Sequence, residues 1–327
     1  MTTQDLQQRF GNSIEKTGLS ETALDLLQNA RSKNTRKAYA CDWNQFSCWS
    51  VDHGFESLPA AESTLVEYLV HLHRLGQSAA TLARKLSALS LAHQARGFRN
   101  PAGALVREIM RGIRRSGAAQ RKADPLLAAD LQRVCDRILP DVLGKRDKAI
   151  LLLGWSAALR RSEISALDLE DLSFSDAGVQ VALWRTKTDQ EGKGQTVGVP
   201  AIDSPYCPIR ALKQWLEIAR IDAGPLFRPV GISGADRFFS IVKNKRLSDR
   251  SICLVVQRRT RQAKLKGYFA GHSLRAGWTT SAAAIGVSSH QLMQHTRHLN
   301  ERIMRGYIRS AELFDVNPLA LMLKSPD

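Results

Sequence analysis

Apolar side chains recur every three or four residues through the first third of the chain, which is the spacing of one face of an α-helix. The pattern occurs in five separate segments between residues 20 and 115. The positions that mark the successive faces are Leu24 and Leu27; Tyr39, Trp43, Phe46 and Ser50; Leu65, Leu69 and Leu72; Leu82, Leu86 and Leu89; and Val106, Ile109 and Ile113. They predict an all-helical domain of four or five short helices over residues 20–115, after an N-terminal tail of residues 1–19.

Helical spacing continues beyond Pro125 to about Leu167 and then gives way to alternation. The alternating apolar positions are Val179, Val181 and Leu183, followed by Val197 and Val199. Period-two alternation between glycine-rich turns predicts a small antiparallel sheet within a second helical domain. Helical spacing then returns over residues 209–219, 250–266, 272–285, 288–295 and 301–308. The predicted fold class is therefore mainly α, with a small antiparallel sheet in the second domain.

The end of the chain predicts one more short helix. Asn317 suits an N-cap and Pro318 suits a first helical turn, within the apolar run VNPLALML. The apolar side chains of this helix must be covered, and folding back on its own domain is one way to cover them. The second domain, with this helix included, is predicted to span residues 126–327.

Two segments are strongly basic. The stretch MRGIRRSGAAQRKADP has no acidic residue before Asp124 and predicts an interdomain linker over residues 116–125, although a charged, solvated helix end explains its arginines equally well. Residues 243–266 hold nine lysines and arginines against one acid, Asp249, which favours nucleic-acid contact over a solvated helix face. The candidate contact residues are Arg111, Arg114, Arg115, Arg121, Lys122, Lys243, Lys245, Arg246, Arg258 and Arg259.

The overall composition also indicates a polyanionic partner. The 327 residues include 47 Lys and Arg against 31 Asp and Glu, a formal net charge of +16. A membrane is not favoured, because there is no run of 18 apolar residues and the first twenty residues lack the apolar segment of a signal peptide. Five scattered cysteines without a Cys-x-x-Cys pair favour reduced thiols over disulfides or a zinc site. We therefore expect a cytoplasmic protein that is associated with DNA in the nucleoid.

Three short stretches carry side chains suited to phosphate chemistry. ALRRSEISAL places Arg160 and Glu163 three residues apart, and GHSLRAG does the same for His272 and Arg275, so each pair shares one side of a helical turn. In the third stretch, QHTRHLNERIMRGYIRS, cations surround Tyr307. They are Arg297, His298, Arg302, Arg305 and Arg309. Such charges should favour the phenolate of a side chain whose unperturbed pKa is about 10. Each stretch taken alone is weak, since surface ion pairs and packing tyrosines are common.

In this order the three stretches resemble the tyrosine recombinase family, with its Arg, His-x-x-Arg, His or Trp, and Tyr. The stretch WRTKT adds Lys187 where that family carries a catalytic lysine. AGHSLRAGWTTSAAAIGVS and GYIRS are particularly similar to the Cre-like branch of phage and plasmid recombinases. The resemblance implies a helical, SAM-like core-binding domain over residues 20–115, the basic linker, and a catalytic domain over residues 126–327.

The resemblance also implies a role for each matching residue. Tyr307 would attack a DNA phosphodiester to form a 3′-phosphotyrosyl link, with His272 accepting its proton and Lys187 protonating the departing 5′ oxygen. Arg160, Arg275 and His298 would stabilise the charge on the non-bridging oxygens. Glu163 would orient an arginine. Because the cations replace a metal and the link conserves the bond energy, no metal ion, ATP or other cofactor is implied.

The sequence departs from the family pattern at two glycines. Ala158 and Arg297 stand where the family usually has Gly. If the second position has a positive φ, Arg297 is expected to carry strain of roughly 1 kcal/mol. Arg161 is a second candidate for the first arginine, but the spacing to Glu163 favours Arg160.

The implied partner is double-stranded DNA with inverted-repeat target sites, bound by a homodimer on each site and a homotetramer in synapsis. Two other functions are compatible with parts of this pattern. A type IB topoisomerase uses similar residues but would act as a monomer. A noncatalytic DNA-binding regulator would have no need to keep all six candidate catalytic residues.

Overall fold

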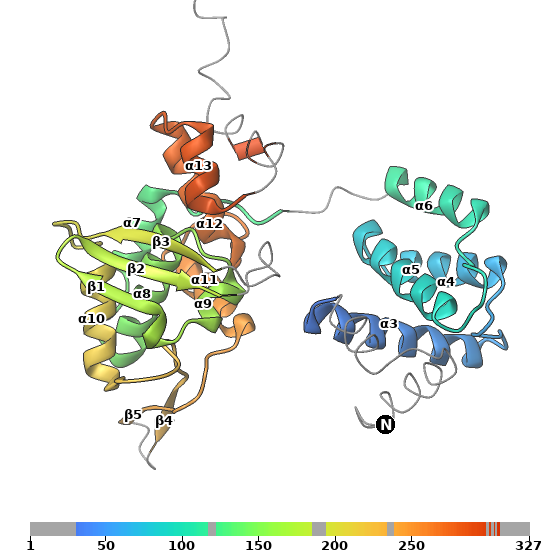
Figure 1. Cartoon of the computed structure of the whole chain (residues 1–327), viewed down its shortest axis with the longest axis horizontal. Helices are drawn as coiled ribbons and strands as arrows, with labels where there is room; N and C mark the ends of the chain where they lie inside the picture. Colours follow the sequence, from blue (N-terminus) through green and yellow to red (C-terminus); the bar gives the residue numbers. More distant parts are fainter. Residues whose placement is uncertain are drawn as a thin grey trace, which may run out of the picture. The chain divides into compact units, whose positions relative to one another are not determined.

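The computed structural model describes residues 31–116, 122–184, 194–233, 239–298, 301, 304 and 306–307. The chain divides into two compact units, residues 1–121 and residues 122–327 (Figure 1). Each unit has its own hydrophobic core. Among the described residues, no helix is both long and apolar enough to cross a membrane.

Helices form the described part of the first unit. They are α3 (Lys33–Asp52), α4 (Glu62–Arg74), α5 (Ala79–Gln94) and α6 (Ala104–Ser116). Ser32 and Ser78 cap α3 and α5, because each side chain accepts a hydrogen bond from a backbone N–H in the first turn. The predicted apolar faces form the core, which includes Phe46, Leu65, Leu69, Leu82, Leu89, Val106 and Ile113. The predicted tail and the helix marked by Leu24 lie outside the described residues.

A buried acid joins α3 to α5. Asp42 is inaccessible to solvent, and its carboxylate accepts from Lys85 Nζ at 3.0 Å and also pairs with Arg84. Losing one partner of such a buried pair leaves an uncompensated charge, so the pair specifies how the two helices pack.

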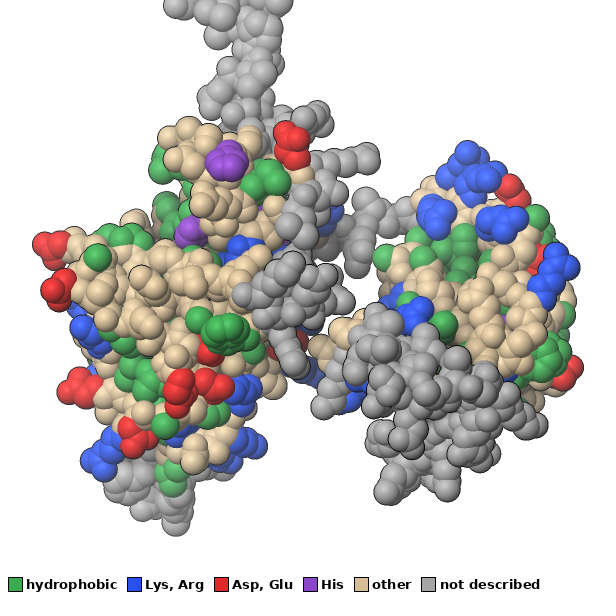
Figure 2. Space-filling view, viewed as in Figure 1, with side chains coloured by type: hydrophobic (Ala, Val, Ile, Leu, Met, Phe, Trp, Pro, Cys, Tyr) green, Lys and Arg blue, Asp and Glu red, His purple; other side chains and the backbone are tan. Residues whose placement is uncertain are grey.

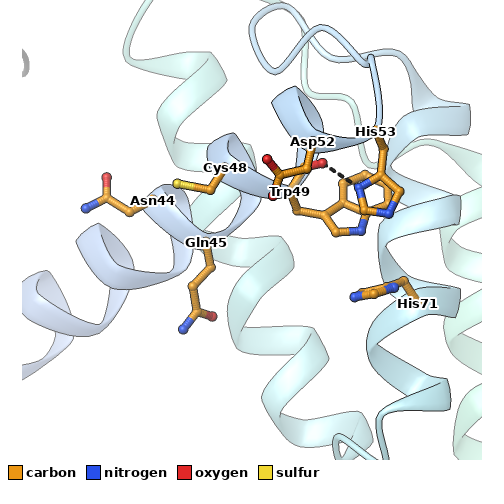
Figure 3. Close-up of a pocket in the computed structure, with 7 residues that line it drawn as sticks. All are labelled: Asn44, Gln45, Cys48, Trp49, Asp52, His53 and His71. Atoms are coloured by element: carbon orange, nitrogen blue, oxygen red, sulfur yellow. Dashed lines mark hydrogen bonds between the residues drawn. The ribbon is translucent and has the colours of Figure 1, made fainter.

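A pocket lies at the C-terminal half of α3 (Figure 3). Its wall includes Trp49, whose indole stacks on the ring of His53 with the ring centroids 4.6 Å apart. His53 Nδ1 donates to the Trp49 carbonyl at 2.8 Å. The pocket contains none of the residues that carry the candidate chemistry.

The second unit is helical with two small sheets. Its elements are α7 (Ala128–Asp136), α8 (Val142–Ser156), α9 (Arg161–Ala166), η2 (Leu169–Asp171), β1 (Leu172–Ser175), β2 (Gly178–Leu183), β3 (Gln195–Pro200), α10 (Pro208–Ala219), β4 (Val230–Ser233), β5 (Phe239–Val242), α11 (Asp249–Gln262), α12 (His272–Ala284) and α13 (Ser289–Thr296). The mainly α fold class is confirmed, as is the predicted antiparallel sheet. The prediction missed β1 and the β4–β5 hairpin, because four-residue strands are too short to show a period.

The three-stranded sheet has the order β1-β2-β3 and is antiparallel throughout. Val179 pairs with Val199 and Val181 pairs with Val197, so the alternating valines of both strands face the core together. The β2–β3 connection contains residues 185–193, which lie outside the described residues and include Lys187. Arg121 and the predicted final helix also lie outside them.

Helix α8 lies at the centre of this unit. Its buried run Ile150–Leu153 leaves no solvated face there, and the helix packs against α7, α9, α10, α11 and α12. A helix buried on several sides is expected to be apolar all round, as this segment is. Because α9 and α12 both pack on α8, the helix carries the two arginine stretches on one support.

Asp147 of α8 anchors α11 through arginines. Its fully buried carboxylate accepts from Arg146 at 2.8 Å and from Arg259 Nε at 2.8 Å, and it also pairs with Arg258. Part of the basic segment over residues 243–266 is therefore used for packing inside the unit.

Candidate active site

Tyr307 and His272 face each other. His272 begins α12, and its Nε2 lies 2.9 Å from Tyr307 Oη. Burial, with Arg275 and Arg160 nearby, lowers the pKa of His272, so the ring is neutral at neutral pH and can accept the phenol proton. The pair has the arrangement of a nucleophile and its general base.

The cations do not activate Tyr307 in the expected way. Burial raises the pKa of Tyr307, and Arg275 opposes this only in part. The expectation that neighbouring cations favour the phenolate is therefore corrected, because removing the phenol from water outweighs them. Arg302, Arg305 and Arg309 lie outside the described residues. Ionisation of Tyr307 at neutral pH would therefore require a base, and His272 lies within hydrogen-bond distance of the phenol.

Arg160 is held at the N-terminus of α9 by Glu163. Its Nη1 donates to Glu163 Oε1 at 2.6 Å, and its backbone N–H donates to Oε2 at 2.9 Å. The neighbouring Arg161 is exposed and pairs with Asp249 at 3.4 Å instead. Of the two candidate arginines, Arg160 is thus the one that contacts the buried acid.

Arg275 lies in the interior, with a relative exposure of 1%. Its Nη1 donates to the Ala158 carbonyl at 2.8 Å and its Nη2 donates to the Thr296 carbonyl, while its Nε has no partner among the described residues. Burial, with Arg160 and Arg297 nearby, lowers the pKa of Arg275 to about 9, which leaves it charged at neutral pH. Arg275 therefore ties together the chain segments that follow α8 and that end α13.

Those two segments are turns of the same type. Ala158 and Arg297 both have left-handed backbones, with φ of 47° and 58°. In each turn the next residue donates to a carbonyl five positions back, Leu159 to Gly154 and His298 to Met293, which is the Schellman pattern at a helix C-terminus. Glycine is the usual residue there, so each non-glycine residue carries strain of about 1 kcal/mol. The conditional expectation for Arg297 is met.

The guanidinium of Arg297 contacts the turn after α8 and also Glu163 of α9. Its Nη2 donates to Glu163 Oε2 at 3.1 Å and to the Ala158 carbonyl at 3.2 Å, and its Nη1 donates to the Ala157 carbonyl at 3.3 Å. The sequence interpretation treated Arg297 only as one of the cations around the tyrosine and as a departure from glycine. The sequence did contain a signal for a special role, namely a charged residue at a position where the family usually has glycine.

The hydrogen bonds of Thr296 place the proton of His298 on Nδ1 in this structure. The Thr296 hydroxyl donates its only proton to the Leu292 carbonyl at 2.6 Å, so its contact of 2.7 Å with His298 Nδ1 requires that Nδ1–H donates. Burial and the cations around it, Arg275 first, lower the pKa of His298 to about 3, so Nε2 carries a lone pair. Donation from Nε2 to a phosphate oxygen requires the other tautomer, which the hydroxyl supports by turning to donate to Nδ1.

His295 is a further side chain that sequence reasoning missed. Its Nε2 donates to the Ser156 carbonyl at 2.8 Å, and its ring stacks on Trp278 with the centroids 3.9 Å apart. These contacts join α13 to the end of α8 and to α12. Within the described ranges, no group of three or more His, Cys, Asp or Glu side chains is placed to hold a metal ion.

Sequence comparison shows the family to which the chain belongs. Residues 126–313 match the Phage integrase family, and residues 23–95 match the Phage integrase N-terminal SAM-like domain. The chain belongs to the phage integrase, or tyrosine recombinase, family. It is 40% identical over 312 residues to an integrase/recombinase xerD homolog of Selenomonas ruminantium, covering 93% of this chain and 89% of that protein. It is 27% identical over 314 residues to a tyrosine recombinase XerC of Pseudomonas fluorescens, covering 90% and 94%.

Solved structures of tyrosine recombinases share the fold. The Tn1549 transposon integrase in complex with transposon right end DNA has a TM-score of 0.56 at 14% identity, covering 95% of this chain and 98% of that one. The XerH site-specific recombinase bound to its difH substrate has a TM-score of 0.56 at 16% identity, covering 97% and 90%. At these identities the likeness concerns the fold alone.

The predicted DNA-contacting residues of this recombinase-family chain fall into two groups. Figure 2 shows basic side chains gathered over the part of the first unit where Figure 1 places α6. The first group is exposed and consists of Arg111, Arg114, Arg115, Lys122, Lys243 and Lys245. Among them, Arg111 forms a surface ion pair with Glu108 at 2.6 Å, which is worth little and leaves it available.

Other candidates are committed to packing. Arg259 has a relative exposure of 7% and is held by Asp147 and Gln262, so this candidate is withdrawn from the surface that could contact phosphate. Arg258 also forms an ion pair with Asp147, but its side chain stays partly exposed. Arg246 binds carbonyls at the end of α9 and pairs with Asp168 at 2.6 Å. A run of like charges in the sequence did not distinguish these internal partners from free cations.

Proposed function

We propose that this protein is a site-specific DNA recombinase that cleaves and rejoins DNA strands through a 3′-phosphotyrosyl intermediate. The observation that carries the proposal is the hydrogen bond of 2.9 Å between Tyr307 Oη and His272 Nε2, beside the fixed guanidiniums of Arg160 and Arg275. The membership of the tyrosine recombinase family supports it.

In the proposed reaction, Tyr307 Oη attacks the scissile phosphorus as His272 Nε2 takes the phenol proton. A bond forms between phosphorus and Tyr307 Oη while the bond from phosphorus to the 5′ oxygen breaks. Lys187 gives that oxygen its proton, so the products are a 3′-phosphotyrosyl link and a 5′ hydroxyl. The reverse attack by a 5′ hydroxyl of a partner strand completes the exchange, and no ATP is consumed because the phosphodiester energy is retained.

The arginines supply the charge for this reaction. Two non-bridging oxygens gain negative charge in the pentavalent transition state, and Arg160 and Arg275 are held where they need no reorganisation. His298 adds a hydrogen bond once its proton is on Nε2. Glu163 orients Arg160, because its two carboxylate oxygens accept from the guanidinium and from the backbone N–H of that residue.

We further propose that the DNA target has inverted repeats, with a homodimer on each site and a homotetramer in synapsis. Related structures support this assembly, since lambda integrase is found as a dimer bound to a core site and XerH is found on a palindromic substrate. In this proposal residues 20–115 form the core-binding domain, residues 116–125 form the linker and residues 126–327 form the catalytic domain. The exposed cations of α6 and the linker bind phosphates.

The function is tested with DNA recovered by crosslinking to the protein. Two copies of that DNA are placed on one plasmid and incubated with the protein in EDTA without ATP. We expect deletion or inversion of the intervening segment. Relaxation of any supercoiled plasmid without exchange would favour a topoisomerase, and binding without a covalent complex would favour a regulator.

Lys187 is expected to act as the general acid. Lys187→Ala should slow cleavage of ordinary DNA much more than cleavage of DNA with a sulfur at the 5′ bridging position, because a thiolate leaves without a proton. General acids typically contribute about 10²- to 10⁴-fold, so most of that loss should disappear with the sulfur substrate. The measurement is the single-turnover rate on both substrates. Equal losses would make Lys187 a phosphate contact only.

A further inference from the structure

Arg297 combines a left-handed backbone with burial, and no other described lysine or arginine of this unit does so. Its φ is 58°, in the region that favours glycine, and its relative exposure is only 7%. A residue with a long charged side chain persists in such a conformation only where its surroundings over-determine it, and such positions cluster at functional sites. The contacts of its guanidinium indicate what that function is.

Glu163 is shared by two arginines. One oxygen, Oε1, accepts from Arg160 Nη1 at 2.6 Å, and the other, Oε2, accepts from Arg297 Nη2 at 3.1 Å. The Arg160 backbone N–H also donates to Oε2, at 2.9 Å, so Arg297 adds a second donor to that oxygen and restricts the carboxylate further. Arg297 therefore supports the orientation of Arg160 from the far side of the carboxylate.

Arg297 also supports Arg275. Both guanidiniums donate to the same carbonyl, that of Ala158, at 3.2 Å and 2.8 Å. Because Arg297 additionally holds the Ala157 carbonyl, the turn after α8 is fixed from the same side. Arg297 thus contacts a group that binds Arg160 and a group that binds Arg275, the two arginines that are proposed to contact the scissile phosphate.

The cluster formed by Arg160, Arg275, Arg297 and Glu163 has a net positive charge. Arg160, Arg275 and Arg297 are three cations, and Glu163 is the carboxylate that the described ion pairs assign to them. The Nε groups of Arg275 and Arg297 are buried without a partner among the described residues. Such a surplus is unfavourable in a free protein and becomes favourable when an anion enters.

We propose that Arg297 is a positioning residue for strand cleavage, which acts through Glu163 to hold Arg160 and through the Ala158 carbonyl to hold Arg275. This inference rests on the proposed function. A merely structural arginine would contribute to folding and to DNA affinity, whereas a positioning residue contributes to the rate of cleavage after DNA is bound.

The test compares Arg297→Gly, Arg297→Lys, Glu163→Gln and the double variant R297G/E163Q. Glycine suits the left-handed backbone, so its φ is not strained, and lysine keeps the charge but offers no planar fork. Arg210→Ala is the charge-matched control, because Arg210 is an exposed arginine of α10 that pairs with exposed Asp203. Each protein is assayed for its DNA dissociation constant, its thermal melt and its single-turnover rate of covalent complex formation on a nicked substrate.

We expect R297G to bind DNA as well as R210A does but to cleave it at least about tenfold more slowly, since small misplacements of catalytic groups cost that much or more. R297K should recover part of the rate. In the E163Q background, R297G should lower the rate by a smaller factor than in the wild-type background, because the part of its effect that passes through Glu163 is already lost.

Several outcomes would overturn the inference. One is a wild-type cleavage rate in R297G, and another is an undiminished loss in the E163Q background. If R297G does not fold, the same comparison is made with R297K. The inference is then overturned if R297K cleaves as fast as the wild-type protein and R297K/E163Q cleaves as fast as E163Q. Absence of a covalent complex from the wild-type protein would overturn the proposed function itself, and this inference with it.

Discussion

Tyr307→Phe is expected to bind target DNA with an affinity close to that of the wild-type protein and to form no covalent complex at all. The substitution removes one hydroxyl and its hydrogen bond to His272 and leaves the half-buried ring in place. In the proposed reaction that oxygen makes the phosphotyrosyl bond, and phenylalanine offers no atom in its place.

The measurement uses a nicked substrate that loses the fragment beyond the cleavage site, so that rejoining is prevented. The wild-type protein should accumulate an SDS-resistant complex with the labelled strand, and gel-shift titration of both proteins should give similar dissociation constants. If Tyr307→Phe still yields that complex, the nucleophile is another residue. If the variant loses DNA binding, the hydroxyl has a structural role that the contacts described above do not explain.

His272→Gln is expected to slow cleavage by about 10²- to 10⁴-fold, the usual contribution of a general base. Glutamine keeps a polar side chain beside Tyr307 but cannot take its proton. The pH profile gives a second readout. The pKa of His272 lies below its ordinary value of about 6.5, so the neutral base persists to lower pH than in a free histidine.

The wild-type rate at low DNA concentration should therefore stay level at neutral pH and fall only as the pH drops through that lowered pKa. His272→Gln should lose this acid limb together with the rate. His290→Gln is the matched control, because His290 is an exposed histidine on α13 outside the site. An unchanged acid limb in His272→Gln would assign the proton transfer to another group.

Much of the fold could be predicted because it follows from local periodicity. The apolar positions around Leu65 and Leu82 share a helical face that must be covered, and the alternating valines of β2 and β3 need a common side. The β4–β5 hairpin could not be predicted in this way. Helix α11 ends at Gln262 rather than near Lys266, because Lys264 takes a left-handed backbone.

The candidate site could be predicted in its residue types but not in its internal contacts. Spacing places His272 and Arg275 on one side of α12, yet it cannot show that the hydrogen bonds of Thr296 place the proton of His298 on Nδ1. Nor does it show that Asp147 withdraws Arg259 from the surface. These contacts join residues far apart in the sequence, or depend on which atom carries a proton. Burial is also a property of the folded chain, so its effect on Tyr307 could not be weighed against the cations beforehand.

The kind of group that binds Arg275 affects how much of its positive charge remains available to a substrate. The acceptors of its two terminal nitrogens are the Ala158 carbonyl, in the turn after α8, and the Thr296 carbonyl, at the end of α13, not a carboxylate. Such carbonyls carry only partial negative charge, about half an elementary charge for a whole helix end, so they stabilise the guanidinium without neutralising it. A carboxylate would act as an internal counter-ion that incoming DNA would have to displace. With dipoles in its place, Arg275 is oriented but not neutralised by an ion pair among the described residues, and in the proposed function its charge is left for a phosphate of the DNA backbone.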